Sequence, residues 1–333
     1  MGCAYRPGVP RLAVAMTPTR VADVCDAATC ELLEERFDVT WAGERLELAQ
    51  LVSGADVVLT SWGTPHLDAA LWADGAGPSV VAHAAGSVKR LVDPVVFDHG
   101  VTVFSAAGRI AWSVGEYCLA AILTLARQLP RFDTAMRAGE WKPAYLRGHE
   151  IRGRAVGVLG ASSTARALIT LLKPFGCDVV VHDPYLDADR AAALGVRTGS
   201  LEDALACPIV SVHVPNVPET RGMVSRKLIE ALPDGAVFVN SSRGPAVDQE
   251  ALLEHALAGR ISAALDVFDV EPPTLAPEHL AAPNLLLSPH VAGDTTEGHL
   301  ALAGYVLADV LAFLDRGERG PSFVDPAAWA TAA

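Results

Sequence analysis

Short apolar runs alternate with longer segments of helical periodicity along most of the chain. In the amino-terminal third, the runs that predict strands are residues 11–16, 37–41, 56–60, 79–84 and 101–104. Helical or turn-rich segments separate these runs, including a predicted helix over 20–36. Alternation of this kind builds a parallel sheet with helices on both faces. We therefore expect one open α/β domain in this part of the chain.

The same alternation resumes after residue 154. It predicts strands at 155–159, 178–182, 208–214, 236–240, 261–267 and 284–288. It also predicts helices at 164–173, 201–205, 225–232 and 248–258. Short loops between such βα repeats fit a second doubly wound parallel sheet.

Three further segments complete the predicted organisation. Residues 111–129 are apolar around most of a helical circumference, which predicts a buried helix that bridges the two domains and also faces a partner subunit. Residues 130–153 are polar and glycine-bearing, and we expect a long connection there. From Thr296 onward the chain is helical again, with one apolar face.

The segment from Arg154 to Tyr185 has the pattern of a dinucleotide-binding βαβ unit. Gly160 marks the turn after the first strand, and Asp183 ends the second strand about 20 residues later, where a carboxylate can bind an adenosine ribose. Ser162 stands where the second glycine of G-x-G-x-x-G is usual, and its Cβ would crowd a pyrophosphate. Since any α/β protein contains strand, glycine, helix and strand, this unit alone leaves cofactor binding open.

Composition narrows the classes of function. A chain of 333 residues with 51% hydrophobic and 20% charged residues predicts two folded domains. A net charge of −13 argues against nucleic acid and anionic lipid as partners. The first residues lack the apolar core of a signal peptide, and the most apolar segment, 110–126, is short for a membrane span and contains Glu116. We expect a soluble cytoplasmic protein.

Neither cysteine nor histidine spacing indicates a metal site. The six cysteines show no C-x-x-C pair and read as buried reduced thiols. The ten histidines show no H-E-x-x-H or other ligand spacing, so we expect no metal.

Polar residues follow several strands of the second sheet. They are His213-Val214-Pro215, Ser241-Ser242-Arg243, the segment from Asp266 to Glu271, and the segment from Ser288 through His290 to Gly293. Because the carboxyl ends of parallel strands share an edge, a base, a fixed cation and a carboxylate should meet there. In the first domain, Gly86 follows a strand and can expose backbone N–H groups to an anion, although an ordinary turn would look the same.

These features together resemble the D-isomer-specific 2-hydroxyacid dehydrogenase family. The matching motifs are SVHVPNVPET around His213, VFVNSSRGPAVD around Arg243, ALDVFDVEP ending near Glu271, and SPHVAG around His290. The resemblance implies a flavodoxin-like substrate-binding domain of residues 1–106 and 295–333, discontinuous in sequence. It further implies an inserted Rossmann NAD-binding domain of residues 107–294, with hinge closure at joins near Ala106 and Asp294.

The resemblance also implies roles for individual residues. Arg243 would bind the substrate carboxylate and polarise the carbonyl, His290 would donate the proton, and Glu271 would orient the imidazole and favour its charged form. The substrate would also be bound by Arg243 and His290, and by the backbone N–H groups of Ser87 and Val88. The implied cofactor-binding residues are Gly160, Ser162, Ser163, Thr164, Asp183, His213, Val214, Pro215, Thr220, Ser241, Ser242, Asp266, His290 and Gly293, with Asp266 facing the nicotinamide carboxamide.

Taken singly, each catalytic residue has a structural alternative. Arg243 could be a surface ion-pair partner, Glu271 a turn residue and His290 a capped structural histidine. Their joint occurrence at the motif positions favours the catalytic roles over these alternatives. The resemblance then implies an NAD-dependent oxidoreductase that transfers a hydride between nicotinamide and a small 2-oxo or 2-hydroxy acid of the D-isomer, in the reductive direction. We also expect a homodimer. Asp183 favours NADH over NADPH, since a carboxylate repels a 2′-phosphate.

A second hypothesis belongs to another class of function. The same fold could serve a catalytically weak or inactive NAD(H)-binding regulatory or interaction protein, and Ser162 could have impaired the nucleotide site. The sequence does not identify the 2-oxo acid, because the side-chain pocket would be built from loops of the first domain, where the resemblance is looser.

Overall fold

The computed structural model describes residues 8–73, 75 and 77–329. The chain divides into two compact units, one from the described parts of residues 1–110 and 294–333 (unit 1), the other from residues 111–293 (unit 2). The first break lies inside a helix, α4 (Ala107–Ala126), about one helical turn after the join expected near Ala106.

Unit 1 is built on a five-stranded, fully parallel sheet of order β2-β1-β3-β4-β5. This is the strand order of flavodoxin-like doubly wound folds, as expected. Its strands are β1 (Arg11–Ala15), β2 (Asp38–Trp41), β3 (Val57–Thr60), β4 (Val80–His83) and β5 (Thr102–Ser105). Its helices are α1 (Pro18–Val24), α2 (Ala27–Arg36), α3 (Leu48–Leu51), α12 (Thr296–Leu300) and α13 (Leu302–Arg316).

The sheet of unit 1 is buried on both faces, which explains its continuous apolar strands. Along β1 the side chains alternate: Leu12 and Val14 enter one core, and Ala13 enters the other. Helix α13 covers the first of these cores with its apolar stripe, which includes Val306 and Val310.

Unit 2 is built on a seven-stranded parallel sheet of order β12-β11-β10-β9-β6-β7-β8. The expected Rossmann arrangement is confirmed: strands on either side of β6 run outward in opposite chain order, which places a topological switch point beside it. The strands are β6 (Ala155–Leu159), β7 (Asp178–His182), β8 (Arg197–Thr198), β9 (Ile209–Val212), β10 (Val237–Asn240), β11 (Ser262–Leu265) and β12 (Leu285–Leu287). The helices are α5 (Leu129–Arg137), α6 (Ser163–Leu172), α7 (Ala188–Leu194), α8 (Leu201–Leu205), α9 (Arg226–Glu230), α10 (Gln249–Leu257) and α11 (Pro277–Ala281), together with most of α4.

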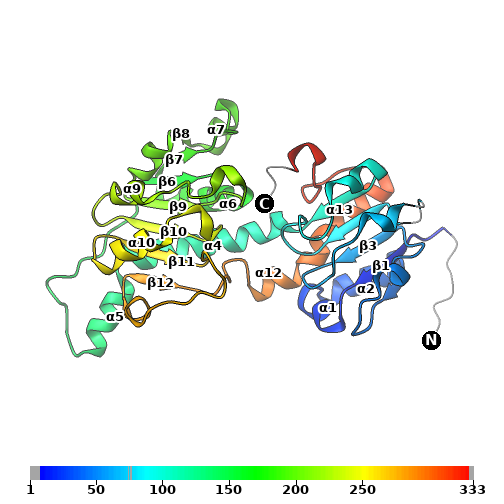
Figure 1. Cartoon of the computed structure of the whole chain (residues 1–333), viewed down its shortest axis with the longest axis horizontal. Coiled ribbons are helices and arrows are strands. Elements are labelled where there is room, and N and C mark those ends of the chain that lie inside the picture. The colour runs from blue at the N-terminus through cyan, green and yellow to red at the C-terminus, as the bar shows by residue number, and fades with distance from the viewer. Residues whose placement is uncertain (1–7, 74, 76, 330–333) are drawn as a thin grey trace. The chain divides into compact units, whose positions relative to one another are not determined.

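The structure corrects two of the sequence expectations. The helix expected over 20–36 is two helices, because Asp26 accepts a hydrogen bond from Thr29 N–H and starts α2 as a new N-cap. The connection expected over 130–153 begins with α5, which carries Pro130 in its first turn, where a proline is tolerated. Figure 1 shows the rest of this connection looping outward before it returns to β6.

Cysteines and apolar helices lie mainly in the cores. Five cysteines within the described residues are free, and Cys25, Cys118 and Cys207 are buried; Cys3 lies outside the described residues. Residues 107–126 and 296–316 are long and apolar enough to cross a membrane, a weak criterion that core helices also meet. The buried residues of the first helix, α4, belong to unit 2, and those of α13 in the second segment belong to unit 1.

The contact between β6 and α8 generates a test of the fold of unit 2. A Cβ on Gly157 would lie 1.9 Å from the Ala204 carbonyl oxygen, so Gly157→Ala must push α8 away. We expect this variant to lower the free energy of unfolding by about 1–3 kcal/mol in urea denaturation followed by circular dichroism. Gly43→Ala is the control, since nothing lies within 4 Å of its Cβ position. Equal stability of the two variants would contradict the packing described here.

Candidate active site

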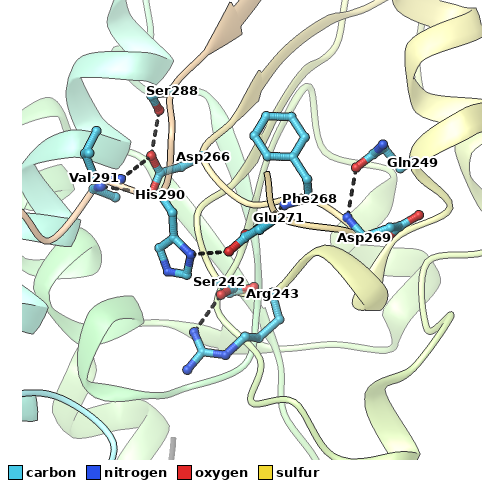
Figure 2. Close-up of polar contacts among 11 residues, drawn as sticks. Ser242, Arg243, Gln249, Asp266, Phe268, Asp269, Glu271, Ser288, His290 and Val291 are labelled. Carbon is cyan, nitrogen blue, oxygen red and sulfur yellow. Dashed lines mark hydrogen bonds and ion pairs between the residues drawn. The ribbon is translucent and has the colours of Figure 1, made fainter. Parts of the chain in front are cut away.

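Three neighbouring strands of unit 2 bring the predicted catalytic residues to one edge of the sheet. Arg243 follows β10, Glu271 follows β11 and His290 follows β12, and these strands pair in parallel register. Figure 2 shows the imidazole of His290 meeting the carboxylate of Glu271, with the Arg243 side chain extending on the same side. The expectation that a base, a cation and a carboxylate share one sheet edge therefore matches the geometry.

His290 and Glu271 form a direct pair. The His290 Nδ1 lies 2.7 Å from Glu271 Oε2, and the other carboxylate oxygen accepts a hydrogen bond from Phe268 N–H at 3.1 Å. Burial opposes ionisation of Glu271, but the hydrogen bonds from His290 and Phe268 and the charges of His290 and Arg243 outweigh it and hold the pKa of this carboxyl below its ordinary value. An ionised Glu271 only accepts, so Nδ1 must donate, and Nε2 of a ring 51% exposed is left for chemistry.

The loop that carries Arg243 is braced from inside the sheet. Asn240, the buried last residue of β10, accepts hydrogen bonds from Ser242 and donates one to the Arg243 carbonyl. The next residue, Gly244, lies against Phe268, where a Cβ would come within 2.0 Å of backbone atoms. These contacts hold the Arg243 loop beside the segment that leads to Glu271. Sequence reasoning missed Asn240, although a polar residue ending a buried strand was a usable signal.

The loop that carries His290 is wrapped around a buried carboxylate. Asp266 is fully buried, and its two oxygens accept hydrogen bonds from Ser288 Oγ at 2.6 Å and from the N–H groups of Val291 and Ala292 at 2.8 Å each. The His290 N–H donates to the Asp266 carbonyl, and His290 itself has a φ of 58°, in the left-handed region. Asp266 thus holds the left-handed His290 loop through hydrogen bonds with other residues of the same chain.

The turn after β6 fits a dinucleotide. Gly160 has a φ of 91°, and a Cβ there would lie 2.7 Å from the His213 carbonyl oxygen. Asp183 accepts hydrogen bonds from Ala161 N–H at 2.6 Å and Tyr185 N–H at 2.8 Å, which fixes its carboxylate beside the turn. Ser162 is the N-cap of α6 with an ordinary φ of −61°. A glycine turn, a helix amino terminus and an oriented carboxylate are the elements that hold NAD in Rossmann domains.

His213 points into the protein. Its ring is 2% exposed, with Nδ1 2.9 Å from Thr164 Oγ1 and Nε2 2.8 Å from Ser211 Oγ. Burial lowers the pKa of His213 to about 3, so the ring is neutral and joins the end of β9 to the start of α6. A cofactor would meet the main chain of the following residues, Val214 and Pro215, rather than this imidazole. Thr220 Oγ1 is likewise used inside its loop, bonded to the carbonyls of Pro215 and Val217.

The expected substrate loop follows β4 in unit 1. Ser105 Oγ donates to the carbonyl of Gly86 at 2.5 Å and so braces the loop, in which Ser87 is exposed and Val88 is buried. Within the part of the chain that the structure describes, no hydrogen bond to the Ser87 or Val88 amide is seen. Two amides of this kind can receive a carboxylate.

Comparisons with known proteins agree with this geometry. The NAD-binding domain model of the D-isomer specific 2-hydroxyacid dehydrogenases matches residues 119–292. The chain belongs to the D-isomer specific 2-hydroxyacid dehydrogenase family, and unit 2 contains its NAD-binding domain.

Individual relatives carry several activity names. The chain is 32% identical to a D-3-phosphoglycerate dehydrogenase of Mycobacterium tuberculosis over 307 residues, which cover 87% of this chain and 58% of that protein. It is 28% identical to a hydroxypyruvate reductase of Thermotoga maritima, over 83% of this chain and 92% of that protein. A phosphoglycerate oxidoreductase from Rhizobium etli shares the fold, with a TM-score of 0.81 at 23% identity over 95% of this chain and 98% of that one.

The nucleotide turn allows a test of the unusual Ser162. Because the φ of Ser162 is ordinary, we expect Ser162→Gly to leave the dissociation constant for NADH within about threefold of wild type. The weaker N-cap should lower the free energy of unfolding by about a few tenths of a kcal/mol. Gly160→Ala should raise that constant more than about tenfold, since its backbone is strained and its Cβ meets His213. Tryptophan-to-NADH energy transfer measures both. A more than tenfold tighter Ser162→Gly variant would instead show that the serine obstructs the cofactor.

Proposed function

We propose that this protein is an NAD-dependent oxidoreductase that reduces a small 2-oxo acid to the D-2-hydroxy acid. The observation that supports it most strongly is the ionised Glu271 holding His290 Nδ1 at 2.7 Å at the sheet edge that also carries Arg243. Reduction of a 2-oxo acid needs a hydride at the carbonyl carbon, a proton at its oxygen and a fixed charge for the carboxylate. When bound, NADH supplies the hydride.

The chain's own residues account for the remaining steps. The guanidinium of Arg243 binds the substrate carboxylate and draws electron density toward the carbonyl oxygen. As the carbon accepts the hydride, the C=O π bond breaks and its electron pair moves to the oxygen, which takes the proton from His290 Nε2. Glu271 then faces a neutral imidazole, which is recharged from solvent. Ser87 and Val88 supply amide donors to the carboxylate.

We further assign unit 1 to substrate binding and unit 2 to NAD. Around the cofactor we place Gly160, the α6 amino terminus at Ser163 and Thr164, the segment from His213 to Thr220, and the residues around Ser241, Asp266 and Gly293. The cofactor is NADH rather than NADPH, because the carboxylate of Asp183 is held beside the turn where it repels a 2′-phosphate.

An inactive NAD(H)-binding interaction protein is the alternative. It would not need an ionised carboxylate on the imidazole or a cation beside the pair, and both groups are in place. Relatives named as dehydrogenases and reductases favour the enzyme. The chain spans 58% of the length of the first of these, so its substrate is an open choice among 2-oxo acids.

A homodimer in the cytoplasm is the assembly that we propose. Unit 2 exposes several large apolar residues on α5 and the connection after it, with exposed fractions from 52% to 74%: Leu129, Met136, Trp141 and Tyr145. Apolar residues gathered on one projecting segment are typical of an interface. The apolar helices α4 and α13 differ from this exposed segment, because they contribute buried residues to the protein interior.

Kinetics test the enzyme hypothesis. NADH oxidation should occur with at least one acid among glyoxylate, hydroxypyruvate, 3-phosphohydroxypyruvate, pyruvate, phenylpyruvate and 2-oxoglutarate. His290→Gln should lower kcat by about 10²–10⁴-fold, since it removes the proton donor, and Arg243→Ala should mainly raise KM for the acid. The control is Arg226→Ala, at an exposed arginine of α9 that pairs with Glu254 of α10; its kcat and KM should stay within about twofold of wild type. An Arg243→Ala variant with unchanged KM for the acid and unchanged kcat would contradict the assigned role.

Light scattering coupled to size exclusion tests the assembly. Met136→Glu together with Trp141→Ser should shift the protein from dimer to monomer, because charge and lost apolar area fall on the exposed α5 segment. Trp41→Ser in unit 1, at a tryptophan 39% exposed, should leave the dimer intact. A wild-type monomer would refute the dimer directly.

A further inference from the structure

Two neighbouring residues of α4 reach the two catalytic loops of unit 2. Tyr117 Oη lies 2.6 Å from Ser288 Oγ, and Cys118 Sγ lies 3.0 Å from Ser241 Oγ. Ser288 is two residues before His290, and Ser241 is two residues before Arg243. The mechanism proposed above uses neither the phenol nor the thiol, although both are set into polar contacts at the active edge.

The direction of the first contact follows from proton counting. Ser288 has one hydroxyl proton, and it donates that proton to Asp266 Oδ1 at 2.6 Å. Tyr117 must therefore donate to Ser288. Burial raises the pKa of Tyr117 to about 12, so the phenol keeps its proton throughout the neutral range. A chain of hydrogen bonds runs from α4 to the carboxylate that holds the left-handed His290 loop.

The second contact holds the opposite side of the site. Cys118 is fully buried, and burial raises the pKa of its thiol to about 11, so it is an S–H group rather than a reactive thiolate. Its partner Ser241 starts the loop that Asn240 braces and that ends in Arg243. Removing the thiol removes this contact at the base of the loop.

A single rigid helix therefore sets both loops. Consecutive residues of an α-helix differ by 1.5 Å in rise and by about 100° in direction, so their side chains reach different neighbours from one backbone. Displacements near 1 Å of reacting groups can cost up to about a hundredfold in rate. Fixing Ser288 and Ser241 to one turn of α4 fixes where the imidazole and the guanidinium stand relative to each other.

We propose that Tyr117 and Cys118 are positioning residues that set the spacing between His290 and Arg243. The inference rests on the proposed function, since it assigns these residues to the same reaction. Neither side chain is assigned a contact with substrate. Tyr117 acts through Ser288 and Asp266 on the proton donor, and Cys118 acts through Ser241 on the carboxylate-binding residue.

Kinetics with NADH and the fastest acid of the panel separate the role of Tyr117 from the role of Cys118. Tyr117→Phe removes only the hydroxyl and should lower kcat by about three- to tenfold with KM nearly unchanged, the effect of one neutral hydrogen bond on the proton-donating loop. Cys118→Ala should instead raise KM for the acid by a similar factor. Cys118→Ser, which can still form a hydrogen bond with Ser241, should restore most of the loss. Tyr117→Phe added to Ser288→Ala should cost no more than Ser288→Ala alone, because the serine substitution already breaks the chain through which Tyr117 acts.

A second readout needs no turnover. Carbon-13 NMR titration of the Glu271 carboxyl, assigned by loss of its signal in Glu271→Gln, should show a pKa nearer the ordinary value in Tyr117→Phe and in Ser288→Ala, because a looser loop weakens the His290 pair. If no acid is reduced, the proposed function fails while this titration still decides the positioning. Tyr305→Phe on α13 and Cys207→Ala before β9 are controls that should change neither readout. An unchanged Glu271 titration together with unchanged kcat and KM in Tyr117→Phe and Cys118→Ala would overturn the proposal.

Discussion

The hydrogen bond between His290 Nδ1 and Glu271 is the interaction on which the chemistry of unit 2 depends. It settles which nitrogen of the ring is engaged, and it keeps the carboxylate ionised by an attraction that outweighs burial. His290 makes this bond from a left-handed backbone, with a φ of 58°. Such a conformation in a histidine persists only where the surroundings over-determine it. The three amides of residues 290–292, all bound to Asp266, provide that constraint.

Asp266 is therefore the structural centre of the site as much as a candidate cofactor contact. A carboxylate with no exposed surface is costly to bury unless its lone pairs are used. Here a hydroxyl and two amides use them, and the hydroxyl is in turn bound by Tyr117. Loop, strand end and helix are thus joined by one hydrogen-bonded network, and such networks rigidify a site when every member has a partner.

The order of elements and the place of the site could be read from the sequence because both follow from local rules. Apolar runs define buried parallel strands, and the ends of such strands share an edge, so Arg243, Glu271 and His290 had to converge. The contacts of Tyr117 and Cys118 could not be read this way, since their partners lie 171 and 123 residues away. The inward-facing ring of His213 was missed because its partner Thr164 lies 49 residues away in the sequence. Helix α5 was not predicted because its sequence is polar. The break between α1 and α2 at Asp26 was not predicted because apolar residues continue at helical spacing on both sides of this N-cap.

The carboxylates at the active edge of unit 2 are bound by backbone N–H groups, and this matters for the electrostatics of the site. The protein carries a net charge of −13, yet the proposed cofactor and substrate are both anions. Three carboxylates stand at the active edge of unit 2, and each is partly neutralised by backbone N–H groups: two amides on Asp183, two on Asp266 and one on Glu271. Their negative charge is thus partly offset by the chain's own amides, and the guanidinium of Arg243 and the amino terminus of α6 add positive charge in unit 2. An acidic protein can in this way present a binding edge that attracts anions, with selectivity set by geometry rather than by long-range charge.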